Sequence, residues 1–396
     1  MSKTETKAKV ERRDVRQEVT DSIMKRLEQG VMPWRRGWID TEQQHALMLP
    51  RNGETGKMYR GGNRLSLLST MHEQGYADPR FFTFNQLRAL EAGPEKGSHG
   101  YPIEYWDKMP FWKRRDCQVL VGTHPVQVHD VRQVGAQTIA TIGADRRDVH
   151  AVHLDVKGPD GQIMRWRQAE KDLDILYARH SVVFNVAQCR GLERYLEANP
   201  LEIPQRSEVQ LDQALEGVVS GMKATGLQVR FEDQNRAYYR PSADLIVMPK
   251  PDQFPDAREF RSTLLHELGH ATGHESRLDR EGITSSDGFG KEKYAREELV
   301  AELTSAFMSA ETGIERVDDQ HAAYIGHWLE ALKGKEGKHI LFEAARDADK
   351  ATDYMLERSQ EREKAVEQDK GPEAEKPGPE QTAPAKRPRE AVDLER

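Results

Sequence analysis

The spacing of apolar residues predicts a series of helices along the chain. From Asp14 onward, apolar side chains recur at four-residue steps, and Gly30 followed by Pro33 ends the pattern, which is typical of an amphipathic helix. Helical spacing returns in three stretches of the second half, at residues 207–225, 292–311 and 319–332. We therefore expect helices near the N-terminus and throughout the second half.

Strand-like runs lie between these helices. Apolar residues alternate or form short continuous runs at residues 102–106, 149–156, 181–186, 228–231 and 244–249. Residues 81–84 lead into a short helix that ends at residue 89, and the segment 200–204 begins and ends with proline, as a linker does. The sequence thus predicts an α+β fold with two domains, residues 12–199 and residues 205–352.

The composition changes after residue 352. Residues 353–396 contain almost no core-forming side chains and are rich in Pro, Glu and Lys. A segment of this kind cannot bury enough apolar surface to offset the conformational entropy lost on folding. We expect a disordered, charged C-terminal tail.

Charges and aromatic rings are unevenly distributed. Residues 1–120 contain 21 Lys+Arg and 16 Asp+Glu, a net charge of +5, whereas the rest of the chain contains 38 and 50, a net charge of −12. The same 120 residues hold 12 of the 28 aromatic residues. Single-stranded DNA binds to cations that follow its phosphates and to rings that stack on its bases. The first domain is therefore a candidate for binding single-stranded DNA; the alternative for each ring is an ordinary place in the core.

Cysteine content and hydropathy indicate the cellular compartment of the protein. The two cysteines, Cys117 and Cys189, are too few for a disulfide framework or a cysteine-based metal cluster. The sequence contains no run of about 18 apolar residues and no apolar signal region at its N-terminus. We expect a soluble, cytoplasmic protein with no membrane segment.

The candidate chemistry lies in the run LLHELGH at residues 264–270. His266 and His270 stand four residues apart and therefore share one face of a helix. Two neutral imidazoles at this spacing can bind one Zn²⁺ at about 2.0 to 2.1 Å, and Glu267 between them can act as the general base in peptide hydrolysis. The alternatives are two histidines in the core of an ordinary helix, or a zinc site without useful turnover.

A second helix supplies the candidate third ligand. Glu298 and Glu302 stand four residues apart, with the small Ala301 between them, as in zincins that use a glutamate ligand. In this arrangement Glu298 binds the metal, and Glu302 orients a ligand histidine through its distal ring nitrogen. The neighbouring Glu297 points about 100° away from Glu298 and is expected to face solvent.

His274 is a rival ligand, because it continues the four-residue series. Each helical turn advances about 5.4 Å, so three successive turns cannot easily converge on one ion. The metzincin pattern would need a histidine at position 276, which is Ser276. We therefore place His274 beside the site, as a residue that supports a ligand or faces the substrate. Candidates for stabilising an oxyanion, by proximity in sequence, are Tyr294, His274 and Arg277.

The predicted strand at residues 244–249 lies just upstream of the metal helix. Zincins keep at this place the edge strand that aligns an extended peptide substrate by adding it to the sheet. We expect residues 244–249 to form such an edge strand.

The candidate DNA contacts combine cations with rings in two segments of the first domain. In one segment, two indoles and two guanidinium groups fall within five residues; the other, residues 51–63, is rich in turn-forming residues and carries three cations. The predicted contact residues are Trp34, Arg35, Arg36, Lys57, Tyr59 and Arg60.

Several ordered motifs resemble the ArdC antirestriction family of conjugative plasmids and related mobile elements. The resemblance covers most of residues 12–345. In the first half it is carried by LEQG at 27–30 with PW at 33–34, by TGK at 55–57 with YRG at 59–61, and by FNV at 184–186. In the second half it is carried by ADLIVMP at 243–249, HELGHATGH at 266–274 with SRL at 276–278, and YAREELVAE at 294–302.

The resemblance implies that the two domains have different functions. The N-terminal domain of the family binds single-stranded DNA, the C-terminal domain is a zincin-like metallopeptidase, and the protein protects incoming single-stranded DNA from host restriction. This chain departs from the family pattern in two places. Position 271 is Ala where many relatives have an aromatic residue, and residues 107–170 are longer and more charged than expected.

Two functions of different classes follow from these features. The leading one is a DNA-associated zinc metallopeptidase that cleaves a protein or peptide, such as a host restriction or DNA-binding protein. No motif in the sequence identifies this substrate. The other is a non-catalytic protein that coats single-stranded DNA and whose zinc domain is structural. A third, a primase-associated accessory factor, has no acidic metal motif in the sequence.

Overall fold

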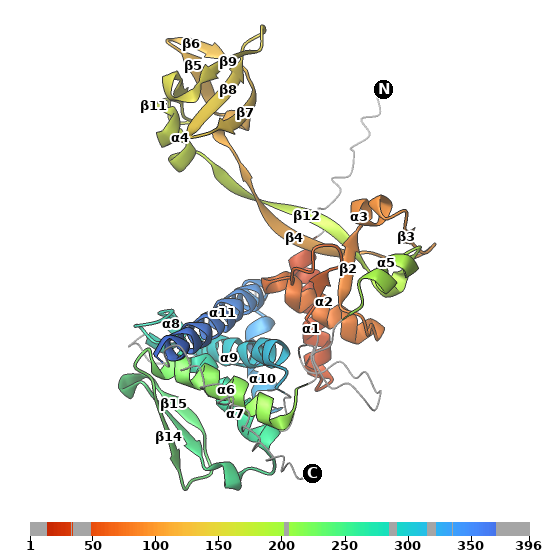
Figure 1. Cartoon of the computed structure of the whole chain (residues 1–396), viewed down its shortest axis with the longest axis vertical. Helices are drawn as coiled ribbons and strands as arrows, with labels where there is room; N and C mark the ends of the chain where they lie inside the picture. The colour runs from red at the N-terminus through yellow and green to blue at the C-terminus, as the bar shows by residue number, and fades with distance from the viewer. Residues whose placement is uncertain are drawn as a thin grey trace, which may run out of the picture.

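The computed structural model describes residues 14–32, 34, 49–201, 206–284, 291–314, 322–334 and 336–369. These residues form a helical body, a small sheet beside it, and a β-module that two long strands hold away from the body (Figure 1). The α+β fold class is confirmed. None of the helices in the described ranges has the length and apolar character needed to cross a membrane.

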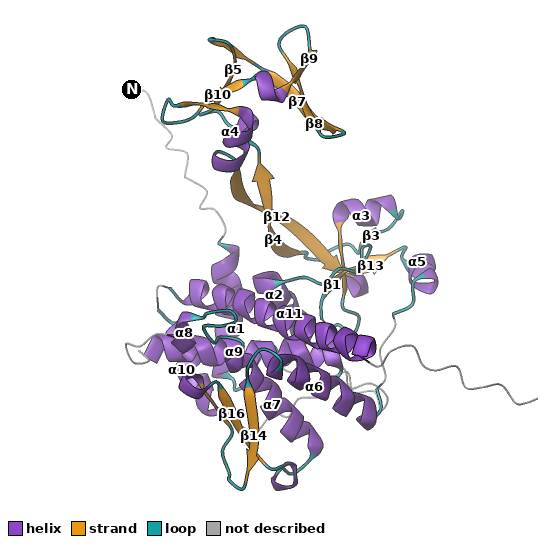
Figure 2. Ribbon diagram, turned by 60° about the vertical axis from the view of Figure 1, so that its left-hand side comes forward, coloured by secondary structure: helices purple, strands orange, loops and turns teal. Residues whose placement is uncertain are grey.

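The helical body combines segments from both ends of the chain. The helices that share its first core, arranged as in Figure 2, are α1 (Val15–Glu28), α2 (Gly61–Gln74), α9 (Lys291–Thr312), α10 (Ala322–Leu332) and α11 (Gly337–Asp369). Ile23 of α1 and Leu65 of α2 belong to the same core as Phe307 of α9. The two predicted domains, residues 12–199 and 205–352, therefore share a core. Helical spacing cannot reveal this, because it does not say which apolar faces meet.

Helix α1 matches the predicted N-terminal helix, whereas α2 was not predicted. The side chain of Asp14 caps the start of α1, and Gly30, with a φ of 75°, follows its end. Helix α2 begins inside the turn-rich segment 51–63, and its first residues are two glycines and an asparagine, which give no helical signal. Gly62 is needed there because a Cβ at this position would approach the Phe342 ring to 2.1 Å.

A three-stranded sheet shares a second core with α6 (Glu208–Lys223) and α7 (Ala257–Ala271). Strand β16 (Leu245–Pro249) lies at its centre, parallel to β14 (Gln228–Glu232) and antiparallel to β15 (Tyr238–Arg240). The prediction that residues 244–249 form an edge strand is therefore wrong. All residues of β16 are buried, as expected for a continuous apolar run, and the edge strand that contacts α7 is β15.

A four-stranded sheet in the order β1-β2-β12-β4 stands beside the body. Its strands are β1 (Arg51–Asn52), β2 (Arg80–Thr83), β12 (Ile175–Asn185) and β4 (Tyr101–Met109). The predicted strands at 102–106 and 181–186 are parts of β4 and β12. Short elements border this sheet: α3 (Phe84–Ala89), β3 (Gly93–Pro94), β13 (Cys189–Arg190) and α5 (Glu193–Ala198).

Strands β4 and β12 continue beyond the sheet as a two-stranded arm that carries the β-module (Figure 1). Met109 pairs with Ile175, so the chain enters and leaves the module at one point. The module has its own core, which includes Phe111, Val156 and Trp166. Residues 107–170, which are expected to be longer than in the family, lie largely within this module. Its elements are β5 (Gln118–Val121), β6 (His124–Val126), β7 (Val128–Val134), β8 (Gln137–Ile142), β9 (Arg147–His150), β10 (Asp155–Lys157), β11 (Ile163–Arg165) and α4 (Trp166–Asp172).

Helix α11 extends well past the predicted start of the tail. The prediction of a disordered segment from residue 353 is wrong as far as Asp369, where α11 ends. Met355 is buried in the core shared with α6, and the helices are so close that a Cβ on Gly221 would lie 2.6 Å from the backbone of Ser359. A few small or apolar residues among many charged ones are thus enough to pack α11 against α6. Residues 370–396 lie outside the described part of the chain.

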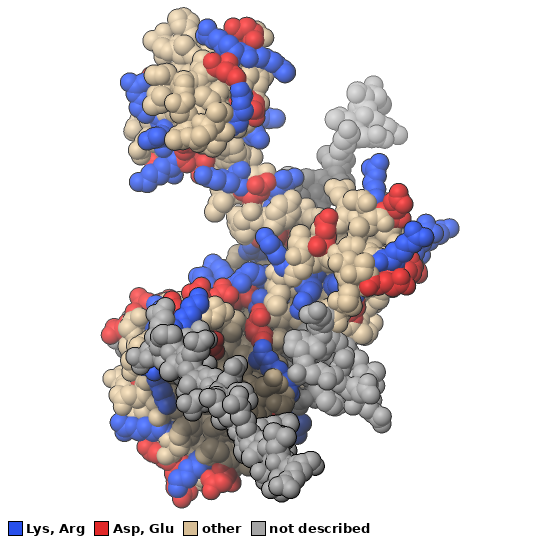
Figure 3. Space-filling model, in the orientation of Figure 1, with Lys and Arg blue, Asp and Glu red and all other residues tan. Residues whose placement is uncertain are grey.

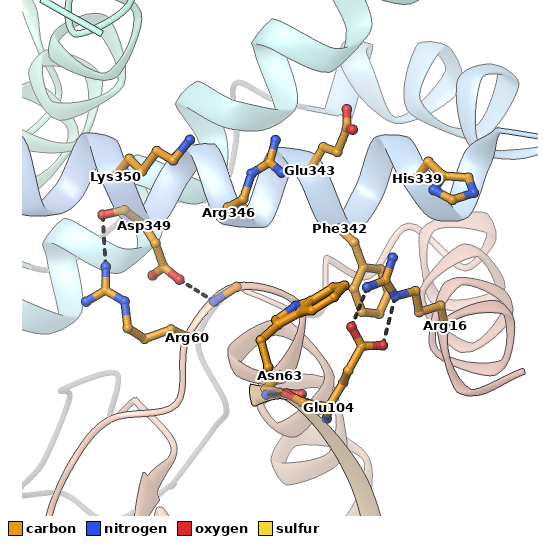
Figure 4. Close-up of a pocket in the computed structure, with 13 residues that line it drawn as sticks. Arg16, Arg60, Asn63, Glu104, His339, Phe342, Glu343, Arg346, Asp349 and Lys350 are labelled. Atoms are coloured by element: carbon orange, nitrogen blue, oxygen red, sulfur yellow. Dashed lines mark hydrogen bonds and ion pairs between the residues drawn. The ribbon is translucent and has the colours of Figure 1, made fainter. Parts of the chain in front are cut away.

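The sheet and the body meet at a polar joint beside α11. A cavity of about 430 Å³ lies there. Figure 4 shows that the Arg16 side chain reaches Glu104 and that the start of α2 reaches Asp349. The buried Asp349 also forms an ion pair with the buried Arg64, at 2.7 Å. Charged groups from the two halves of the chain therefore neutralise one another at the joint.

Candidate metal centre

Helix α7 places the HELGH motif in the interior of the body. The Asp256 side chain caps its N-terminus by accepting a hydrogen bond from the backbone of Glu259. At the other end, the Arg280 guanidinium donates to the carbonyl oxygens of Gly269 and His270, at 2.8 and 3.4 Å, and to the Thr272 hydroxyl, at 2.6 Å. Side-chain groups therefore satisfy both ends of the metal helix.

Three side chains converge between α7 and α9. The Nε2 atom of His266 lies 3.5 Å from one carboxylate oxygen of Glu298, and the Nε2 atom of His270 lies 3.6 Å from the other. The ligand atoms of all three residues lie within 4.8 Å of one another. Ligands at about 2.0 to 2.2 Å from a tetrahedral ion are separated by about 3.3 Å, so this donor set fits a metal ion such as Zn²⁺.

A close helix crossing brings the third ligand within reach. A Cβ on Gly269 of α7 would lie 3.2 Å from the Cα of Ala301 on α9, so a larger residue would push the helices apart. With the backbones this close, side chains on both flanks of α9 reach α7. The small residues of the HELGH motif and of the second helix are therefore part of the geometry of the site.

Both histidines have a carboxylate behind the ring. The Nδ1 atom of His270 lies 3.4 Å from Glu297, and the Nδ1 atom of His266 lies 3.8 Å from Glu302. A carboxylate at this position fixes the ring orientation and raises the basicity of the ligand nitrogen. Glu302 thus lies beside the distal ring nitrogen of His266, beyond hydrogen-bond distance.

The expectation that Glu297 faces solvent is wrong. Glu297 is buried, and Arg280 holds its two carboxylate oxygens through Nε at 3.1 Å and Nη2 at 2.6 Å. Sequence reasoning missed both residues of this pair. One signal was present: between Glu298 and Glu311 the sequence of α9 contains a single charged residue, Glu302, and a helix without a charged face is buried on every side, which leaves no solvent face for Glu297.

The carboxylates set the protonation of the metal-free site. Burial lowers the pKa of His270, but its interactions with Glu297 and Glu298 outweigh burial and raise the pKa to about 10. Burial raises the pKa of Glu298, yet the bonds with His266 and His270 bring it well below its usual range. A metal ion must therefore displace a proton from His270 in order to bind.

Glu267 is buried next to the two ligand histidines. Burial raises the pKa of its carboxyl group, while the charges of His266 and His270 and a hydrogen bond from the backbone of Tyr239 act in the opposite direction. A carboxyl group whose pKa is raised can both take up and release a proton closer to neutral pH. Because Tyr239 belongs to β15, the edge strand of the sheet contacts the predicted general base directly.

The remaining candidates near the site have other surroundings. Arg277 donates to Asp244 at 2.9 Å and to the carbonyl of Ala271 at 2.7 Å, and its side chain has no exposed surface, so its geometry assigns it to an ion pair rather than to an oxyanion. His274 bonds to Ser276 at 2.8 Å and is not part of the ligand cluster found among the described residues. Tyr294 is partly exposed on α9.

The predicted DNA contacts that the structure describes do not form one surface. Trp34 is completely buried, and a ring with no exposed surface cannot stack on a base, so this prediction is wrong. Tyr59 is half-buried against the Phe81 ring, which also removes it from a stacking role. Lys57 is exposed, and Arg60 is exposed but forms an ion pair with Asp353. The remaining two predicted contacts, Arg35 and Arg36, lie outside the described residues.

The fold and the ligand cluster define the class of the second half as a zincin-like metallopeptidase domain. In agreement, a family described as zincin-like metallopeptidase matches residues 217–347, and the N-terminal domain of anti-restriction factor ArdC matches residues 13–184. The chain belongs to the ArdC family of antirestriction proteins.

Two solved structures of one protein support this assignment. The chain is similar to the antirestriction ArdC protein from the R388 plasmid in its metal-free structure, at 28% identity and a TM-score of 0.60, over 88% of this chain and 99% of that one. The Mn(II)-bound structure of the same protein matches at 28% identity and a TM-score of 0.59, over 88% and 98%.

Curated relatives extend the family to longer proteins. Two Escherichia coli proteins named DNA primase TraC are each 34% identical to the chain, over 340 and 341 residues. These matches cover 86% and 85% of this chain, which spans 27% and 19% of the two primases. The uncharacterized protein y4eC of Sinorhizobium fredii is 31% identical over 343 residues, which is 86% of this chain and 91% of that protein. The primase activity named for the longer proteins therefore does not transfer to this chain.

Proposed function

We propose that the chain is a single-stranded DNA-binding protein with a zinc-dependent metallopeptidase domain, which acts in the cytoplasm as an antirestriction factor and protects the incoming DNA of a mobile element. The observation that carries the peptidase is the convergence of His266, His270 and Glu298 beside the buried Glu267. The antirestriction role is supported by the similarity to R388 ArdC over nearly all of that protein.

The arrangement supports hydrolysis of a peptide bond. A Zn²⁺ ion held by His266, His270 and Glu298 supplies Lewis acidity toward the scissile carbonyl. Glu267 takes a proton from the attacking water and gives it to the leaving amine. The outer edge of β15, next to Glu267, is suited to pairing with an extended segment of a protein substrate, such as a host restriction or DNA-binding protein.

Charge and exposed rings support the binding of single-stranded DNA. Residues 1–120 carry a net charge of +5, and Lys57 is exposed in the turn before α2. On the arm, Trp106 is 59% exposed and Tyr105 lies under the guanidinium of Arg179, so the arm carries both rings and a cation; Figure 3 shows further Lys and Arg side chains at its surface. Such rings can stack on unpaired bases. Binding should therefore weaken steeply with salt and favour single strands over duplex.

A single substitution tests the peptidase. Glu267→Gln should retain zinc and lose cleavage, because the amide cannot accept the proton from water. The matched control is Glu275→Gln, which alters an exposed carboxylate just beyond the same helix. Purified protein, zinc and single-stranded DNA would be incubated with restriction enzymes and DNA-binding proteins, and fragments counted by mass spectrometry. Equal cleavage by both variants would contradict the mechanism.

The alternative function is a coat on single-stranded DNA whose zinc domain is structural. The same Glu267→Gln variant separates the two in cells that carry a restriction system. If it protects incoming DNA as well as the unmutated chain does, protection comes from coating; if protection is lost while DNA binding persists, it requires proteolysis.

A further inference from the structure

Trp34 lies in the interior of the body, just after helix α1. Its side chain has no exposed surface, and its ring contacts the Trp328 ring of α10 edge-on, with 5.8 Å between the centroids. The residue belongs to the core that joins α1 and α2 to the helices of the second half. An N-terminal residue thus packs against α9, the helix that carries the third metal ligand.

The indole of Trp34 reaches the carboxylate that backs a ligand. Its Nε1–H donates to one oxygen of Glu302 at 3.3 Å, and the other oxygen of Glu302 lies 3.8 Å from Nδ1 of His266. Glu302 is itself completely buried. The indole is thus hydrogen-bonded to Glu302, and Glu302 lies beside the imidazole, beyond hydrogen-bond distance, so the three groups stand in a row between the N-terminal segment and the metal site.

The hydrogen bond from Trp34 restricts the orientation of Glu302. A carboxylate can turn about its last bond, and a donor on one oxygen fixes which oxygen faces the imidazole. Because the bond lies in a region without solvent, water cannot replace the donor when it is removed. The carboxylate beside His266 is thus held by a residue more than two hundred positions away in the sequence.

We propose that Trp34 is a positioning residue of the metal centre, which acts on His266 through Glu302, so that the N-terminal segment completes the metal site. The inference rests on the proposed function, in that the site must bind a metal ion. It also gives the PW motif at residues 33–34 a role other than DNA contact.

The experiment compares two tryptophans in matched surroundings. Trp34→Phe keeps an aromatic ring and removes the donor. The control, Trp166→Phe, does the same in the β-module, where the buried Trp166 donates to Glu170 at 2.8 Å. Zinc dissociation constants of the full chain would be measured against a competing chelator. We expect Trp34→Phe to weaken zinc binding about tenfold, the lower end for residues that support ligands, and Trp166→Phe to leave it unchanged.

A double-mutant cycle separates positioning from packing. If Trp34 acts through Glu302, Trp34→Phe should weaken zinc binding no further in a Glu302→Gln background. A second tenfold loss in that background would overturn the inference, as would equal zinc affinities of Trp34→Phe and the unmutated chain.

A measurement on the unmutated protein tests the inference without relying on a folded variant. The ¹⁵N–¹H resonance of the Trp34 indole should shift on zinc titration, while that of Trp166 stays in place. Zinc binding without any shift at Trp34 would overturn the inference alone. Absence of zinc binding by the unmutated chain would overturn the proposed function and the inference with it.

Discussion

The metal centre and the β-module differ in how they are joined to the rest of the protein. The metal centre lies where α7 crosses α9, and each of its polar groups is backed by another residue, some from distant parts of the chain. The module has a separate core and is attached through two paired strands. One region therefore depends on the whole body, whereas the other is independent of it. This contrast predicts different responses to deletion, substitution and pH.

The largest expected effect comes from deletion. Removing residues 1–34 takes Ile23, Leu27 and Trp34 out of the shared core, at about 2 to 5 kcal/mol for each large side chain, which is comparable to the whole stability of a domain. We expect loss of the cooperative thermal transition and of zinc binding.

The matched deletion removes the β-module. Residues 110–174 would be replaced by an Asn-Gly turn that joins Met109 to Ile175, which already pair. The helical body should keep a cooperative thermal transition, and the zinc stoichiometry should be that of the full chain. A cooperative, zinc-binding protein without residues 1–34 would contradict the shared core.

Substitution of Arg280 should have the next largest effect. Arg280→Ala leaves the buried Glu297 without its ion pair and uncaps α7, which should lower the free energy of unfolding by about 3 to 5 kcal/mol. The control is Arg258→Ala at the other end of α7, where a half-exposed pair with Asp256 contributes about 0 to 1 kcal/mol. Denaturant titrations with equal midpoints for the two variants would show that Glu297 is solvated.

Replacing the carboxylates behind the histidines tests the metal centre more narrowly. Glu297→Gln and Glu302→Gln should each weaken zinc binding by about 10- to 100-fold, because each amide supports its imidazole less well. The exposed Glu275→Gln serves as the control. If Glu297 faced solvent, as its position on the helix alone suggests, its variant would match the control in competition titrations.

The pH dependence of zinc binding follows from the raised pKa of His270. Its protonated form stabilises the metal-free fold fully below about pH 6.5, the ordinary value for histidine, and this stabilisation is lost as pH rises through about 10. Zinc competes with that proton, so zinc affinity should rise between these values. Calorimetry at pH 7.5 in buffers of different ionisation enthalpy should detect proton release, and a value of zero would contradict the assigned protonation.

The smallest effect is expected at the DNA contacts. If Lys57 neutralises one phosphate, Lys57→Ala should reduce the slope of log affinity against log salt by about 0.7 for single-stranded DNA. Arg60→Ala should change it less, since Arg60 already pairs with Asp353. Fluorescence anisotropy with a labelled oligonucleotide measures both, and equal slopes for all three proteins would remove Lys57 from the DNA-binding surface.

The sequence predicted the features that depend on short-range periodicity. The four-residue spacing of His266 and His270 and that of Glu298 and Glu302 lie within single helices, so the geometry of a helix was enough to place them on matching faces. The continuous apolar run of β16 likewise identified a strand, although not its central position.

Features that depend on distant packing were not predictable in this way. Burial of Glu297 requires Arg280, and burial of Trp34 requires α9 and α10; no spacing rule links these pairs. The end of the ordered chain was misplaced for a similar reason. Two glycines of α6 allow α11 to continue against it through a segment whose composition alone indicates disorder.

The close crossing at Gly269 bears on which ions the site can select. It fixes the distance between the metal donors, which lie on two separate helices. This distance cannot increase unless the two backbones move apart. Ca²⁺ needs six to eight oxygen ligands at about 2.3 to 2.6 Å, which two nitrogens and one carboxylate held at this separation do not offer. The glycine at position 269 thus holds the two helices at the separation at which their three donors reach a single ion.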